Sequence, residues 1–175
     1  MKNGSFVREA VQISLFSALI ACAAFFSFPI FSVPITLQSF AVFLALFILG
    51  TKRGTLAVVV YVLLGIVGLP VFSGFSGGIG KLLDIGGGFI FGFCVLAITY
   101  SVSLKVFGTS GVSTIISALI GQAFLYACGV VWYVIMFDGD FWYGVYAFVL
   151  PFVLFDLGKI VLALVIAKKI KKLMK

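Results

Sequence analysis

An acid and a base lie together in the middle of an apolar segment. Residues 150–170 have the sequence LPFVLFDLGKIVLALVIAKKI, whose central charges are Asp156 and Lys159. Residues three positions apart share one face of a helix, so the two side chains are expected to be neighbours. A charge near the centre of a bilayer costs about 3 kcal/mol, and such charges more often mark a substrate or ion path than serve structure alone. We therefore predict that Asp156 accepts hydrogen bonds from a polar small molecule and that Lys159 donates them. A structural ion pair is the alternative.

The sequence offers little for catalysis. It contains no histidine, no HExxH motif and no second carboxylate within an apolar run. The glycine-rich GFSGGIGK resembles a phosphate-binding loop, but Leu82 follows Lys81 where that motif needs serine or threonine. Cys22, Cys94 and Cys128 lie in three separate apolar runs and are expected to be packing residues. We expect no catalytic residue, metal or cofactor, and any energy for transport must come from an ion gradient or from partner proteins.

The composition is that of a membrane protein. Of the 175 residues, 63% are hydrophobic and 10% are charged, and the mean hydropathy is +1.33. Soluble domains carry about 25% charged residues. The chain is therefore predicted to be an all-α integral membrane protein, with residues 1–175 forming one transmembrane substrate-binding domain. The basic start, MKNGSFVREA, is interpreted as leading into the first membrane helix, because no cleavage pattern follows it.

Six transmembrane helices are predicted to form a compact bundle. Their approximate ranges are 11–28, 36–50, 54–69, 86–106, 112–136 and 143–168. A spanning helix needs about 20 residues. The second and third ranges are short by this measure, so we expect tilt, re-entrance or shielding by neighbouring helices there.

The basic residues indicate the orientation of this bundle. With both termini in the cytoplasm, ten of the twelve lysines and arginines fall in inside regions. The exceptions are Lys81, in an outer loop, and Lys159, within a span. This asymmetry satisfies the positive-inside rule. The net charge of +7 is thus explained by membrane orientation, and no nucleic-acid partner is expected.

Two further patterns suggest surfaces for binding. Residues 68–88, GLPVFSGFSGGIGKLLDIGGG, are too rich in glycine for a helix and too apolar for a free linker. We predict an outer loop that folds back and caps a pocket; a flexible connection is the alternative. In the first span, Ser14, Ala18 and Cys22 form a stripe of small residues at a spacing of four. Such stripes allow close helix contact in lipid, either with another protein or inside the same bundle.

Several motifs together resemble the BioY family, the biotin-binding S components of energy-coupling factor (ECF) transporters. The motifs are VPITLQSFAVFLA (33–45), GIVGLPVFSGFSGGIGKLL (65–83), GGGFIFGF (86–93) and PFVLFDLGKIVLA (151–163). The resemblance extends along nearly the whole chain. It implies a six-helix S component in the cell membrane, which captures biotin from outside and delivers it inward. Its partners would be a transmembrane coupling protein and two cytosolic ATPases.

The resemblance also implies roles for individual residues. The family's DxxK pair corresponds to Asp156 and Lys159, and its AxxxA docking stripe to Ser14, Ala18 and Cys22, only one of which is alanine here. Ser76 stands in an imperfect GGxGG motif. The family's GPTGGY turn appears as residues 84–89, which end in Phe89 and lack the proline, threonine and tyrosine.

Two further candidates complete the predicted site. Gln38 starts a span and could bind the ligand or only cap its helix. Lys81 could meet the biotin carboxylate. The ureido ring of biotin offers N–H donors and a carbonyl acceptor to the Asp–Lys pair, which could instead bind the carboxylate. Alternatives are an S component for another vitamin or a biotin precursor, an ion-coupled solitary carrier, and an intramembrane enzyme acting on lipid.

Overall fold

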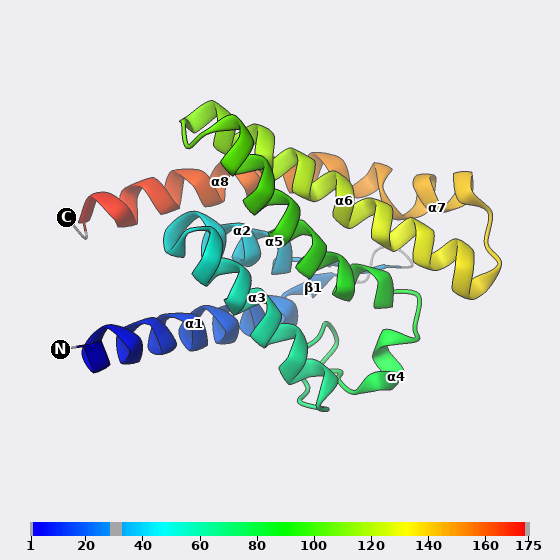
Figure 1. Ribbon diagram of the computed structural model, residues 1–175. Coiled ribbons are helices and arrows are strands. Elements are labelled where there is room, and N and C mark those ends of the chain that lie inside the picture. Colours follow the sequence, from blue (N-terminus) through cyan, green and yellow to red (C-terminus); the bar gives the residue numbers. More distant parts are fainter. Residues whose placement is uncertain (1, 29–32, 174–175) are drawn as a thin grey trace.

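The computed structural model describes residues 2–28 and 33–173, and this part of the chain is almost entirely helical. Figure 1 shows the long helices packed side by side, with both ends of the chain at the same end of the molecule. The long helices are α1 (Lys2–Phe25), α2 (Gln38–Leu49), α3 (Thr51–Ile66), α5 (Gly87–Phe107), α6 (Gly111–Phe137) and α8 (Leu150–Leu173). Two short helices are α4 (Ile79–Leu82) and α7 (Phe141–Phe148). Strands β1 (Ser27–Phe28) and β2 (Ile35–Thr36) form a small antiparallel pair before α2.

Four helices, α1, α5, α6 and α8, are long and apolar enough to cross a membrane. Helix α2 has 12 residues and α3 has 16. At 1.5 Å per residue their lengths are about 18 Å and about 24 Å, shorter than a hydrocarbon core of about 30 Å. Every side chain from 41 to 47 in α2 is buried. Neighbouring helices therefore shield α2, which is one of the arrangements expected for a short second span.

The predicted sixth span, 143–168, is not one helix. Helix α7 ends at Phe148, α8 begins at Leu150, and Val149 lies between them with φ −119° and ψ −59°. Pro151 lacks a backbone N–H, so it is tolerated in the first turn of α8 but would interrupt a continuous helix. The prediction of an unbroken helix was therefore wrong. With α4 and α7, the described residues form eight helices instead of six.

Glycines bring α5 and α6 into close contact. A Cβ added at Gly88 would lie 2.3 Å from the Trp132 Cβ, and one at Gly129 would lie 2.2 Å from the Phe89 ring. Neither position has room for a methyl group. The two helices therefore pack backbone against side chain, as small residues allow within a membrane.

The glycine-rich loop between α3 and α5 packs on the bundle, as predicted. Phe72 is 1% exposed and meets Tyr61 edge-on, with ring centroids 5.7 Å apart. Phe75 stacks on Phe25 of α1 at 4.2 Å. The Trp132 indole N–H of α6 donates to the Asp84 carbonyl oxygen at 3.2 Å. The loop is thus held to α1, α3 and α6.

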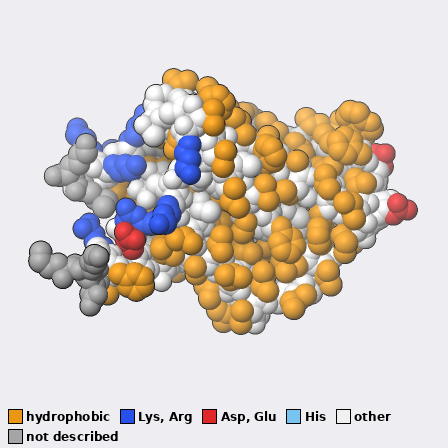
Figure 2. All heavy atoms as spheres, in the orientation of Figure 1, with side chains coloured by type: hydrophobic (Ala, Val, Ile, Leu, Met, Phe, Trp, Pro, Cys, Tyr) orange, Lys and Arg blue, Asp and Glu red, His pale blue; other side chains and the backbone are white. Residues whose placement is uncertain are grey.

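Most of the basic charges on the surface lie at one end of the molecule. Figure 2 shows lysines and arginines gathered at the end that carries both termini, with an acidic group among them, further acidic groups at the opposite end, and hydrophobic side chains covering the surface between the two ends. On α7, Trp142, Tyr143 and Tyr146 are more than half exposed. Exposed tryptophan and tyrosine are typical of a membrane–water interface.

Candidate ligand-binding site

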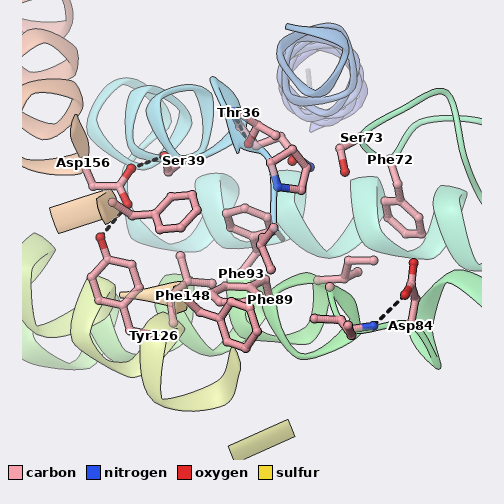
Figure 3. A pocket seen from close by; sticks show the side chains of 18 of the residues that line it. Thr36, Ser39, Phe72, Ser73, Asp84, Phe89, Phe93, Tyr126, Phe148 and Asp156 are labelled. Atoms are coloured by element: carbon pink, nitrogen blue, oxygen red, sulfur yellow. Dashed lines mark hydrogen bonds between the residues drawn. The ribbon is translucent and has the colours of Figure 1, made fainter. Parts of the chain in front are cut away.

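A cavity of about 150 Å³ lies among the glycine-rich loop, β2 and helices α2, α5, α6, α7 and α8. Figure 3 shows Asp156 and Asp84 toward opposite ends of this cavity, with the rings of Phe89, Phe93 and Phe148 between them. Its remaining lining residues include Val33, Pro34, Thr36, Gln38, Ser39, Phe72, Ser73, Lys81, Ile85, Leu125, Tyr126, Phe152 and Lys159. The cavity therefore has two polar ends joined by an apolar, aromatic middle.

The carboxylate of Asp156 accepts hydrogen bonds from three helices. Oδ1 accepts from the Ser39 hydroxyl at 2.9 Å and from the Lys159 ammonium at 2.9 Å. Oδ2 accepts from the Gln122 amide at 2.8 Å and from the Tyr126 hydroxyl at 2.6 Å. A carboxylate offers about four acceptor positions, so Asp156 is saturated. We call these five residues the Asp156 cluster.

Lys159 is equally well satisfied. Its Nζ donates to the Thr36 carbonyl at 2.7 Å, to Asp156 Oδ1 at 2.9 Å and to the Ser39 hydroxyl at 3.2 Å. The side chains of Lys159 and Asp156 are 12% and 7% exposed. Buried charges need this kind of pairing and full hydrogen bonding. The cluster therefore holds two charges inside the bundle and links the start of α2 to α6 and α8.

The other end of the cavity carries a second ion pair. Lys81 Nζ lies 2.7 Å from Asp84 Oδ2, and both residues line the cavity. The hydrogen bond from Lys81, followed by that from the Ile85 backbone N–H, holds the pKa of Asp84 below its usual range. The pair is partly exposed, so it can exchange partners more easily than the buried Asp156–Lys159 pair.

Most of the predicted binding residues meet at this cavity. Asp156, Lys159, Gln38, Phe89 and Lys81 all line it. Gln38 is 5% exposed, and its amide donates to the Tyr61 hydroxyl.

Ser76 is not among the described residues that line the cavity. Its hydroxyl donates to the Ser73 carbonyl at 2.8 Å within the loop, and Ser73 itself faces the cavity. A direct role of Ser76 in ligand binding therefore has no geometric support here.

The predicted docking stripe lies apart from the cavity on α1. Ser14, Ala18 and Cys22 are exposed, whereas Ser17 and Ala21 on the adjoining stripe are buried. Ser17 donates to the Ala57 carbonyl of α3 at 2.8 Å. The internal contact with α3 thus uses the adjoining stripe and leaves the predicted one facing outward.

Four residues that bind the charged pair were not predicted from the sequence: Thr36, Ser39, Gln122 and Tyr126. Gln122 and Tyr126 are four positions apart, so they share a face of the apolar helix α6. This pair of polar residues in an apolar helix could have been recognised from the sequence as a candidate for the binding site. Ser39 directly follows Gln38, but nothing in the local pattern distinguishes it from a helix-end serine.

Comparison with known proteins identifies the family. The BioY family model matches residues 1–175. A biotin transporter BioY from Thermotoga maritima is 42% identical over 168 residues, covering 95% of this chain and 98% of the relative. A probable biotin transporter BioY from Pyrococcus horikoshii is 36% identical over 166 residues, covering 94% and 96%. A crystal structure of the S component for biotin from an ECF-type ABC transporter superposes with a TM-score of 0.87 at 26% identity, covering 98% of this chain and 95% of the other. This chain therefore belongs to the BioY family.

Proposed function

We propose that this protein is the biotin-binding S component of an ECF transporter and has no enzymatic activity of its own. The observation that carries the proposal is the buried, fully hydrogen-bonded Asp156–Lys159 pair at one end of an aromatic cavity. Relatives that cover almost the whole chain are named biotin transporters. Biotin has a polar ureido group at one end, apolar rings and a chain in the middle, and a carboxylate at the other end.

The two-ended cavity suggests how biotin lies in it. We place the ureido group at the Asp156 cluster, where a carboxylate and an ammonium can serve its donors and its acceptor. Phe89, Phe93 and Phe148 flank the apolar middle of the cavity. The carboxylate then points to Lys81. Because every acceptor position of Asp156 and every proton of Lys159 already has a partner, the ligand must replace internal hydrogen bonds. Ser39, which bonds to both charges, is the partner we expect to be replaced first.

The membrane topology follows from the same proposal. We infer six crossings, in which α1, α2, α3, α5 and α6 provide five and α7 and α8 together provide the sixth. Both termini lie in the cytoplasm, because lysines and arginines gather at their end of the molecule. The glycine-rich loop then caps the cavity on the outer side of a multi-pass cell-membrane protein.

The sequence contains no ATP-binding loop, so the energy for transport must come from an ion gradient or from partner proteins. We propose that a transmembrane coupling protein docks on the exposed stripe Ser14, Ala18 and Cys22 of α1, and that two cytosolic ATPases supply the energy. Small exposed residues suit this role because they let another helix approach closely within the bilayer.

Titration of the purified protein tests the ligand. Biotin is expected to bind at or below micromolar concentration, whereas thiamine and riboflavin at the same concentration give no response. Calorimetry measures the affinity directly. Trp132 contacts the loop through Asp84 and provides a fluorescence signal. Tight binding of dethiobiotin without binding of biotin would favour the precursor alternative, and no response to either would contradict the proposal.

Lys81 is expected to recognise the ligand carboxylate. The Lys81→Met variant should bind biotin about 5-fold more weakly, since a partly exposed ion pair contributes at most about 1 kcal/mol. It should bind biotin methyl ester as the unchanged protein does. The Asp84→Asn variant removes the competing partner of Lys81, so biotin should bind it at least as tightly. Equal losses for biotin and its ester in Lys81→Met would contradict this role.

A further inference from the structure

A second cavity, of about 170 Å³, lies between α6 and α8 on the other side of the Asp156 cluster. Leu119, Val153 and Leu157 form part of its wall and are 39%, 38% and 41% exposed on the surface of the bundle. Its other lining residues are Gln122, Ala123, Tyr126, Asp156 and Ile160. We call this cavity the lateral crevice. Its half-exposed apolar rim places it on the side of the bundle that faces lipid.

The lateral crevice and the ligand cavity are separated by one layer of side chains. Among the described residues, Tyr126 and Asp156 are the two that line both spaces. The Tyr126 hydroxyl donates to Asp156 Oδ2 at 2.6 Å, which fixes the ring between the two spaces. Tyr126 and Asp156 therefore lie between the two spaces, and we call them the separating layer.

Gln122, which lines the crevice, has one unused hydrogen-bond acceptor. Gln122 donates its amide N–H to Asp156 Oδ2, and a carboxylate cannot donate in return, so the orientation of the amide is fixed. Gln122 is 4% exposed, and within the described residues its Oε1 has no hydrogen-bond partner. A buried acceptor without a partner is unfavourable.

We propose that Tyr126 is a specificity-determining residue that limits the size of the ligand end bound at Asp156. This inference rests on the proposed function and on placing the ureido group at the Asp156 cluster. When the Tyr126 ring is present, a substituent on a ureido nitrogen of biotin clashes with the separating layer. With a shorter residue at position 126, the two spaces join, and a short alkyl or hydroxyalkyl group on that nitrogen extends into the lateral crevice.

The test compares biotin with biotin methylated on a ureido nitrogen and with biotin methyl ester, using calorimetry. The unchanged protein should prefer biotin strongly over the N-methyl compound. In Tyr126→Ala that preference should fall about tenfold or more, since one misplaced methyl group in a closed pocket costs about that much. The preference over the methyl ester should not change, because the ester lies at the Lys81 end.

Matched variants separate the ring from its hydroxyl group. Tyr126→Phe keeps the ring and should retain the preference against N-methyl biotin. Phe124→Ala removes an exposed aromatic ring from the same helix and should also retain it. Tyr126→Leu is shorter than tyrosine, better packed than alanine, and should behave as Tyr126→Ala does; it provides the test if the alanine variant fails to fold.

Three outcomes would overturn the inference. They are an undiminished preference in both Tyr126→Ala and Tyr126→Leu, a loss of preference in Phe124→Ala, and a gain for the methyl ester in place of the N-methyl compound. Failure of the proposed function would give a different result: the unchanged protein would then not bind biotin at all.

Discussion

The Asp156→Asn variant is expected to bind biotin about 100-fold more weakly than the unchanged protein. The substitution keeps the shape of the side chain but removes the charge, and one of its two polar atoms becomes a donor facing other donors. A hydrogen bond to a charged group contributes about 1.5–3 kcal/mol, and each 1.4 kcal/mol corresponds to about a tenfold change in affinity. Calorimetric titration measures the loss.

The controls must separate binding from folding, because the Asp156 cluster also links three helices. Asp138→Asn is the matched change at an exposed helix end, and it should alter neither binding nor thermal stability. Asp156→Asn leaves Lys159 buried without its counter-ion, which lowers stability as well. The double variant Asp156→Asn/Lys159→Met removes both charges, so it should regain thermal stability without regaining affinity. Normal biotin binding by the double variant would show that the pair is structural.

The Ala18→Leu variant is expected to bind biotin normally but to lose about tenfold or more of its uptake activity. Ala18 is exposed in the middle of the proposed docking stripe, and no residue of that stripe lines the cavity. A leucine there holds a partner helix away from α1, whereas close approach in membranes depends on small residues. Radiolabelled biotin uptake by cells that also express the coupling protein and ATPases measures this effect.

Ala127→Leu provides the matched control, since Ala127 is exposed on α6 and lines neither cavity. It should leave both binding and uptake unchanged. If uptake by the Ala18 variant equalled that of the control, docking would not use this stripe. A parallel loss of binding would show that the substitution disturbs the bundle itself.

The sequence was sufficient to predict the charged pair because Asp156 and Lys159 are neighbours on one helix, where a fixed spacing determines contact. Their other partners are distant in the chain: Ser39 lies 117 positions from Asp156, and Gln122 lies 34 positions away. Contacts between residues so far apart in the chain leave no periodic pattern in the sequence. Hydropathy likewise predicted where apolar segments lie but not the break at Val149, because apolar residues continue from α7 into the first turns of α8.

In the glycine-rich loop, the place of a residue in a motif predicted its contacts less well than its apolar character did. Ser76 was selected for its place in a motif, yet its hydroxyl bonds within the loop and Ser73 faces the cavity. The direction of a side chain in such a loop depends on local backbone angles, which glycines leave open. Phe72, by contrast, is buried against Tyr61, as the apolar residues of the loop suggested.

The close glycine contact between α5 and α6 has a consequence for the thermodynamics of ligand capture. Phe89 and Phe93 come from α5, and Leu125 and Tyr126 from α6, so one wall of the cavity belongs to a helix pair that has no free space at Gly88 or Gly129. That wall is preorganised. Ordering side chains on binding costs about 0.5–1.5 kcal/mol for each mobile group, and the ligand avoids this entropy loss on the α5–α6 side. We therefore expect the adjustments on binding to occur on the opposite side of the cavity, which includes Ser39 of α2.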